Sequence, residues 1–163
     1  MTQKPLFKKI TQIGLVVRNV EQTAKRCWEQ FGMGPWTFYT FEPSRVEEMT
    51  VHGKRVDHAM RTAHATIGGI DWEIIEPLDD KSIYAEHLKT QGEGLHHILF
   101  EVDNYADAKA QIERNGHREL ASGKWVGNPY AYFDTQKALA CIAELWSPPA
   151  DSRSLPPSDS TYP

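Results

Sequence analysis

Four polar side chains lie within apolar stretches of the sequence that are typical of β-strands, and together they could bind a metal ion. The four are Gln12 in QIGLVV, Glu73 in DWEIIEP, His97 in HILFEV and Glu144 in CIAELW. A charged side chain on an apolar strand is unfavourable unless it is paired or metal-bound. One amide oxygen, one imidazole and two carboxylates suit a borderline or hard divalent ion. Octahedral geometry would leave two further positions for water or substrate oxygens.

Taken singly, these residues have plainer interpretations. Gln12 could be an exposed edge residue, Glu73 could face solvent on an alternating strand, and His97 could be a core histidine bonded to backbone. Glu144 is the hardest to explain in this way, because its surroundings are otherwise apolar. The case for a shared site therefore depends on whether the four positions correspond to one another.

The composition is that of an ordinary globular protein. The chain has 163 residues with a net charge of −4, and no basic stripe indicates nucleic-acid binding. The N-terminal residues lack an apolar signal-peptide core, and no apolar run is long enough for a membrane helix, so we expect a cytoplasmic protein. Cys27, in a predicted helix, and Cys141, in a predicted strand, are expected to be buried free thiols.

The order of predicted elements is β-α-β-β-β, a connector, and then β-α-β-β-β. The first half comprises a strand over 9–17, a helix over 19–31, and strands over 35–43, 57–67 and 70–77, with a loop at 44–56. The second half comprises a strand over 95–102, a helix over 104–115, and strands over 117–125, 128–135 and 138–146. The predicted divisions are an N-terminal arm (1–8), a first module (9–78), a connector helix (79–93), a second module (94–147) and a Pro/Ser-rich tail (148–163), flexible or laid across a neighbour.

The two halves form a weak internal repeat with one consistent offset. Gln12 corresponds to His97 and Asn19 to Asn104, both 85 positions apart. Each half supplies one of the four polar residues at the start of its first strand and one within its last. We expect two curved four-stranded units to pair edge to edge and leave a trough between them. His96 and His97 form a doublet of adjacent histidines. The offset selects His97 as the member that faces the cavity, and strand alternation directs His96 to the other face.

The stretches ITQIGLVVRNV, WEIIEPL, GEGLHHILFEVDN and CIAELW resemble the vicinal oxygen chelate superfamily over about residues 9–147. This resemblance implies an α+β fold in which two tandem βαβββ modules form an open, U-shaped barrel around a metal site. Its implied ligands are Gln12, Glu73, His97 and Glu144, and its implied cofactor is one divalent ion, Zn, Co, Ni, Mn, Mg or Fe. The strand motifs resemble methylmalonyl-CoA epimerases, whereas the ligand set is similar to that of zinc-type glyoxalase I. Because position 12 is not a histidine, the set departs from the ring-cleaving dioxygenases.

Both leading families abstract a proton next to a carbonyl, so the resemblance implies an isomerase, epimerase or lyase. It makes Glu144 the favoured base and Glu73 its candidate partner. The epimerases also use a glutamate on the third strand of the first module, but this stretch of the chain has none. Arg61, His58 or His64 could face the cavity there instead, and an arginine would favour a carboxylate or phosphate group.

The stretch over 125–134 is rich in aromatic residues and could line the cavity. The candidate substrate-binding residues are Arg61, His64, Trp125, Asn128, Tyr130 and Tyr132. Ordinary strand aromatics are an equally good interpretation of the last four. The expected partners are a small carbonyl or carboxylate substrate and a second copy of the chain in a homodimer. The alternatives are a non-catalytic binding protein of the antibiotic-resistance type and a ring-cleaving dioxygenase.

Overall fold

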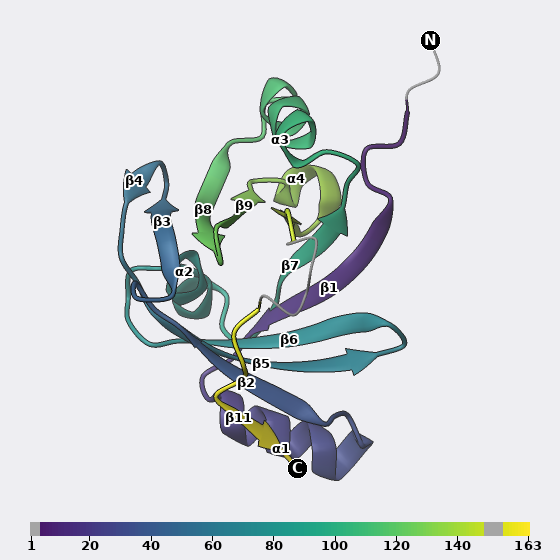
Figure 1. The fold of residues 1–163 in the computed structure, drawn as a ribbon, viewed down its shortest axis with the longest axis vertical. Coiled ribbons are helices and arrows are strands. Elements are labelled where there is room, and N and C mark those ends of the chain that lie inside the picture. The colour runs from purple at the N-terminus through teal and green to yellow at the C-terminus, as the bar shows by residue number, and fades with distance from the viewer. Residues whose placement is uncertain (1–3, 149–154) are drawn as a thin grey trace.

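The strands of the computed structural model, which describes residues 4–148 and 155–163, form one strongly curved sheet (Figure 1). The strand order is β11-β2-β5-β6-β1-β7-β10-β9-β8-β3-β4. The strands are β1 (Lys9–Val16), β2 (Trp36–Phe41), β3 (Val46–Val51), β4 (Lys54–Arg55), β5 (Met60–Ile67), β6 (Ile70–Pro77), β7 (Gly94–Glu101), β8 (Glu119–Trp125), β9 (Asn128–Phe133), β10 (Ile142–Trp146) and β11 (Ser160–Tyr162).

The helices are α1 (Val20–Phe31), α2 (Ile83–Thr90), α3 (Tyr105–Arg114) and the short α4 (Gln136–Leu139). The side chains of Asn19 and Asn104 cap α1 and α3, so the repeat extends to the start of each helix. α1 packs on the outer face of β2, β5 and β6, and α3 packs on the outer face of β9 and β10. None of the helices in the described part of the chain is long and apolar enough to cross a membrane.

The two halves of the sheet meet along β1 and β7, which pair antiparallel. β2, β5 and β6 continue the sheet on one side of this junction, and β10, β9 and β8 continue it on the other. The predicted fold of two tandem βαβββ units is therefore confirmed, and the halves pair edge to edge within one chain. An apolar core on the concave side of the sheet includes Val16, Ile75, Tyr84 and Ile142.

The predicted loop over 44–56 is wrong, because it contains β3 and β4. β3 belongs to the first half of the chain but pairs with β8 of the second half. A β-bulge interrupts its pairing between Glu47 and Thr50, and Glu48 has a φ of 54°. The bulge places both Val46 and Met49 in the core, so the strand lacks the strict alternation that sequence patterns reveal.

The predicted strand over 138–146 is only partly correct. It begins at Ile142, because the preceding residues form α4 and Ala140 adopts the left-handed region with a φ of 60°. The hydroxyl of Thr135 accepts a hydrogen bond from the backbone N–H of Ala143 and donates one to the carbonyl of Cys141. Cys141 is therefore buried in the turn before the strand.

The described end of the tail lies on its own chain. β11 pairs antiparallel with β2, and Asp159 forms an ion pair with Arg45 at 2.8 Å. The sequence predicted a tail that is either flexible or laid across a neighbour, and the structure places residues 159–162 along β2 of the same chain. Residues 149–154 lie outside the described part. β11 covers the edge of β2, which would otherwise leave unpaired backbone groups.

Candidate metal centre

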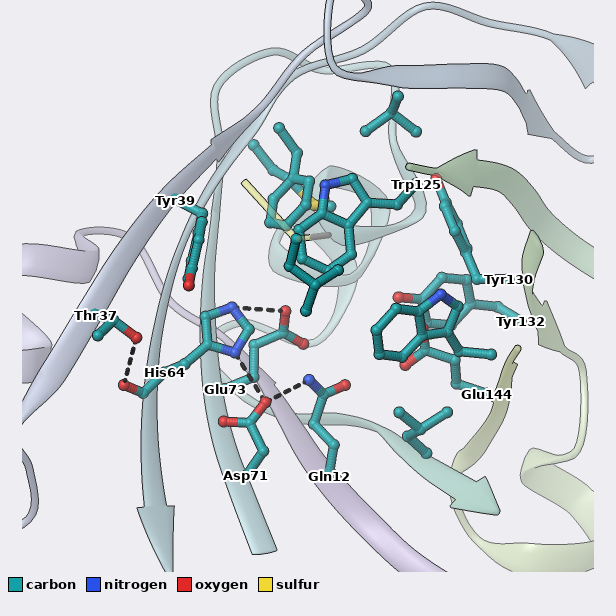
Figure 2. A pocket seen from close by; sticks show the side chains of 16 residues that line it. Gln12, Thr37, Tyr39, His64, Asp71, Glu73, Trp125, Tyr130, Tyr132 and Glu144 are labelled. Carbon is teal, nitrogen blue, oxygen red and sulfur yellow. Dashed lines mark hydrogen bonds and ion pairs between the residues drawn. The ribbon is translucent and has the colours of Figure 1, made fainter. Parts of the chain in front are cut away.

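A cavity of about 270 Å³ occupies the concave side of the sheet (Figure 2). Most of its wall is apolar or aromatic, and its polar groups are gathered at one end. Its lining residues are Gln12, Thr37, Tyr39, Phe41, Val46, Met60, His64, Asp71, Glu73, Leu99, Trp125, Tyr130, Tyr132, Glu144, Trp146 and Leu155. Among these described residues there is no lysine or arginine, and the carboxylates of Asp71, Glu73 and Glu144 are present.

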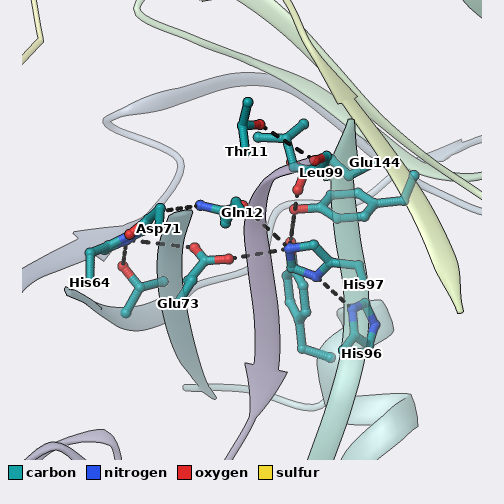
Figure 3. A network of polar contacts seen from close by, with 12 residues as sticks. Thr11, Gln12, His64, Asp71, Glu73, His96, His97, Leu99 and Glu144 are labelled. Carbon is teal, nitrogen blue, oxygen red and sulfur yellow. Dashed lines mark hydrogen bonds and ion pairs between the residues drawn. The ribbon is translucent and has the colours of Figure 1, made fainter. Parts of the chain in front are cut away.

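Three of the four predicted ligands converge around one atom of the fourth, Nε2 of His97 (Figure 3). This nitrogen lies 3.1 Å from Oε2 of Glu144, 3.3 Å from Oε2 of Glu73 and 3.5 Å from Oε1 of Gln12. The four side chains come from β10, β6, β1 and β7, which are neighbouring strands of one chain. The site is thus assembled between the two halves of a single chain.

Strand register explains this convergence. Gln12 pairs with Leu99, and Gly14 pairs with His97. The 85-residue offset converts the first pair into the second, because Gln12 corresponds to His97 and Gly14 corresponds to Leu99. Glu144 also pairs with Leu99, from the other side of β7. A Cβ atom at Gly14 would overlap the His97 ring, so the ring can lie across β1 only because this position is glycine.

Burial and charge make this cluster costly without further compensation. His97 is fully buried, and Glu144 and Glu73 are 6% and 7% exposed. Burial lowers the pKa of His97, but Glu144 and Glu73 outweigh it and raise this pKa to about 9. Burial also raises the pKa of Glu144, which the neighbouring His97 only partly offsets. Apart from these contacts with His97, Oε2 of each glutamate has no hydrogen-bond partner among the described residues.

These residues fit a divalent ion. When two ligand atoms each lie about 2.1 Å from a metal and subtend a right angle at it, they are about 3.0 Å apart. The distances from Nε2 of His97 to the three oxygens are close to this value. The unpartnered Oε2 atoms of Glu73 and Glu144 are hard anionic donors that a cation would satisfy. Within residues 4–148 and 155–163, no three His, Cys, Asp or Glu side chains are arranged so that they could hold a metal ion as they stand. The oxygens gather around the ring nitrogen, which is itself one of the candidate ligand atoms.

A second polar pair, His64 and Asp71, lies beside the cluster. Nδ1 of His64 is 2.8 Å from Oδ2 of Asp71, and the same oxygen accepts a hydrogen bond from Nε2 of Gln12 at 2.7 Å. Nε2 of His64 lies 2.8 Å from the hydroxyl of Thr62 and 3.6 Å from Oε1 of Glu73. Burial lowers the pKa of His64, but Asp71 and Glu73 raise it overall. Burial raises the pKa of Asp71, but the bond to His64 lowers it overall.

The predicted wall residues divide into two groups. His64, Trp125, Tyr130 and Tyr132 line the cavity. Arg61 does not, which corrects its predicted placement. It lies on the opposite face of β5, pairs with Glu21 of α1 at 2.8 Å and covers the ring of Phe38.

Asn128 is also outside the cavity. Its amide donates a hydrogen bond to the carbonyl of Val126 in the turn between β8 and β9. His58, the third candidate on the first half, is buried with its ring near Tyr84 and does not line the cavity. Strand alternation separates His64 from Arg61 on β5. Met60, Thr62 and His64 share one face of the strand, while Arg61, Ala63 and Ala65 share the other.

Several residues of the cavity were not predicted from the sequence. Asp71 is two positions before Glu73 on β6, so strand alternation could have placed it on the same face. The same rule could have found Tyr39 and Phe41 on β2, and Trp146 two positions after Glu144. Leu155 had no sequence pattern to reveal it, because it reaches the cavity from the tail.

Taken together, the curved sheet and its enclosed polar cluster define the class of paired βαβββ proteins that hold a small-molecule cavity between two halves. The chain belongs to the Glyoxalase/Bleomycin resistance protein/Dioxygenase superfamily, whose family model matches residues 11–133.

Individual relatives agree with this membership. The chain is 29% identical over 94 residues to an ethylmalonyl-CoA/methylmalonyl-CoA epimerase of Cereibacter sphaeroides, covering 55% of this chain and 70% of that protein. The crystal structure of methylmalonyl-CoA epimerase from Mycobacterium tuberculosis superimposes with a TM-score of 0.68 at 15% identity, covering 91% of this chain and 93% of that one. A Streptomyces coelicolor methylmalonyl-CoA epimerase in complex with 2-nitronate-propionyl-CoA gives 0.60 at 21% identity, covering 88% and 99%. These structural likenesses show that the fold is shared.

Proposed function

We propose that the protein is a divalent-metal-dependent isomerase or epimerase that moves a proton on the carbon next to a carbonyl group. The observation that carries this proposal is the convergence of Gln12, Glu73 and Glu144 on Nε2 of His97 at one end of a ligand-sized cavity. A lyase of the glyoxalase type would use the same chemistry and remains within the proposal. The relationship to an ethylmalonyl-CoA/methylmalonyl-CoA epimerase supports the epimerase form.

The residues that would hold the ion are Gln12, Glu73, His97 and Glu144. The chemistry that such an ion supplies when bound is the stabilisation of negative charge on a carbonyl oxygen of the substrate. Burial of the cluster excludes water, which strengthens every charge interaction made there.

Two groups of the protein could carry the proton. Glu144 would accept it at its carboxylate, and burial of this carboxyl raises its pKa toward the range useful for a general base. In Figure 2, His64 lies across the cavity from Glu144. Asp71 holds the His64 ring through Nδ1. Nε2 of His64 would then return a proton from the opposite side. This arrangement suits an epimerase, because one face of the carbon loses a proton and the opposite face gains one.

The substrate class in this proposal is a small carbonyl or carboxylate compound. Tyr39, Phe41 and Trp125 form an aromatic wall in which Trp125 lies 5.2 Å from Phe41, ring centre to ring centre. Such a wall favours a flat or cyclic apolar group next to the reacting carbonyl. The CoA ester named for the relative is therefore one candidate and an aryl carbonyl compound is another.

The test combines metal analysis with proton exchange. The purified protein is loaded with Zn²⁺, Co²⁺, Ni²⁺, Mn²⁺ or Mg²⁺ in turn, and exchange of the α-proton of each candidate is followed by NMR in deuterium oxide. We expect one ion per chain and metal-dependent exchange with at least one candidate. Glu144→Gln should abolish exchange and His97→Ala should abolish metal binding, whereas Glu101→Gln, an exposed glutamate, is the matched control. Unchanged metal content and exchange in both variants would refute the assignment.

The aromatic wall also favours a second function, a non-catalytic binding protein. Such a protein would bind flat apolar compounds without metal and without exchange. Titration of the metal-free protein with aryl carbonyl compounds, read from the fluorescence of Trp125 and Trp146, separates the two functions. Binding that is unaffected by metal, together with no exchange, would favour the second function.

The homodimer is a further part of the proposal. Light scattering of the full chain at several concentrations measures the mass directly. Since the four candidate ligands converge within one chain, a monomer would not contradict the proposed chemistry.

A further inference from the structure

The two histidines of the doublet face each other, although neighbouring side chains of a strand normally point to opposite faces. Nδ1 of His96 lies 3.0 Å from Nδ1 of His97, and the two rings are nearly perpendicular at 86°. A β-bulge produces this arrangement, because Gly14 pairs with His97 while the next residue, Leu15, pairs with Leu95. His96 is therefore the extra residue of the bulge, and bulges of this kind re-aim side chains.

The same bulge occurs in the other half. On β1, Ile10 pairs with Phe100 and Gln12 with Leu99, so Thr11 is the extra residue. Thr11 and His96 are 85 positions apart, the offset that also relates Gln12 to His97. Each first strand thus carries a bulge immediately before its candidate ligand.

The hydrogen bond between the two rings needs one proton on one of the facing nitrogens. A neutral imidazole that binds an ion through Nε2 carries its only proton on Nδ1. Nδ1 of His97 must then donate, and the partner the structure provides is Nδ1 of His96. His96 consequently accepts at Nδ1 and carries its own proton on Nε2.

We propose that His96 is a positioning residue of the metal centre, which accepts the Nδ1–H of His97 and so fixes the ring with Nε2 toward Glu73 and Glu144. This inference rests on the proposed function. It is a role normally filled by a carboxylate or a backbone carbonyl. His96 is 2% exposed, and the ring of Tyr84 lies 5.0 Å from it, so the acceptor is itself enclosed.

The test compares three variants of the full chain. His96→Phe keeps a ring but removes the acceptor, His96→Asn keeps a short acceptor, and His87→Phe replaces the buried histidine on the other side of His96. The dissociation constant for Zn²⁺ is measured by competition with a chelating indicator. We expect His96→Phe to bind about 10- to 100-fold more weakly, His96→Asn to recover most of this loss, and His87→Phe to match the natural chain.

A second measurement needs no variant. Nitrogen-15 NMR of the zinc-loaded natural chain reports which ring nitrogen of each histidine carries the proton. We expect the proton on Nδ1 of His97 and on Nε2 of His96. Two results would overturn this inference but leave the proposed function intact. One is a proton on Nδ1 of His96, and the other is a folded His96→Phe variant that binds Zn²⁺ as tightly as the natural chain. Failure of the natural chain to bind any divalent ion would instead overturn the proposed function with it.

Discussion

The imidazole ring of His97 lies directly over Gly14, its pairing partner on β1. A Cβ atom at Gly14 would lie 2.6 Å from Nδ1 of the ring and closer still to two other ring atoms. Because the two residues pair across the junction of the two halves, neither backbone can withdraw without breaking the sheet that joins them.

Gly14→Ala should therefore destabilise the protein by about 1–3 kcal/mol and weaken metal binding, because the added methyl group displaces His97. Urea unfolding and a Zn²⁺ titration measure the two effects. Gly123→Ala is the matched comparison, since the atoms nearest its Cβ belong to the outer end of the Tyr130 side chain and not to a candidate ligand. Equal stability losses in the two variants would contradict the special role of Gly14.

Removal of metal should make the stability of the protein pH-dependent on the alkaline side. His97 has an ordinary pKa of 6.5 and a folded-state pKa of about 9 in the absence of metal. Between these values the folded state binds more protons than the unfolded state, so the free energy of unfolding falls as pH rises. Below pH 6.5 the contribution of His97 is fully present.

Urea unfolding of the metal-free protein across this window provides the measurement. His97→Gln should flatten the dependence. Zinc-loaded protein should show the opposite slope, because His97 must lose its proton to bind the ion and affinity therefore rises with pH. A flat profile for the metal-free natural chain would contradict the raised pKa of His97.

Two residues that are close in sequence, Arg61 and His64, should differ in their effect on proton exchange. His64→Gln should slow exchange about 100-fold or more, because it removes a proton carrier that lines the cavity. Arg61→Gln should leave exchange unchanged, since this side chain lies on the α1 face of β5. Loss of the partly exposed ion pair between Arg61 and Glu21 should lower stability by less than about 1 kcal/mol. Slow exchange in Arg61→Gln would mean that β5 presents its other face to the substrate.

Removal of residues 155–163 should lower stability and promote self-association. The deletion exposes the edge of β2, takes Tyr162 from the core beneath α1 and opens the cavity where Leu155 lines it. Thermal unfolding and light scattering measure these effects. Asp159→Asn is the control, because its partly exposed pair with Arg45 is worth less than about 1 kcal/mol. If the deletion behaved like Asp159→Asn, β11 would contribute little.

Sequence periodicity indicated the helices, most strands and that His97, rather than His96, lies against Glu73 and Glu144, because these features depend on local alternation and on one constant offset. The offset of 85 placed Gln12 and His97 in corresponding positions, and the register of β1 and β7 shows the same relation. The hydrogen bond between the rings of His96 and His97 could not be predicted. Strand alternation directs His96 to the opposite face, and a β-bulge overrides this alternation.

Only the tertiary structure decided which distant residues share the site. Asp71 bridges Gln12 and His64 because three strands bring their side chains to one face, and no sequence spacing encodes that meeting. β3 crosses to β8 and β11 covers β2 for the same reason: pairing between strands depends on edges left free by the rest of the fold. The sequence by itself indicated four groups that could bind a metal, and folding decided that three of them surround one nitrogen atom of the fourth.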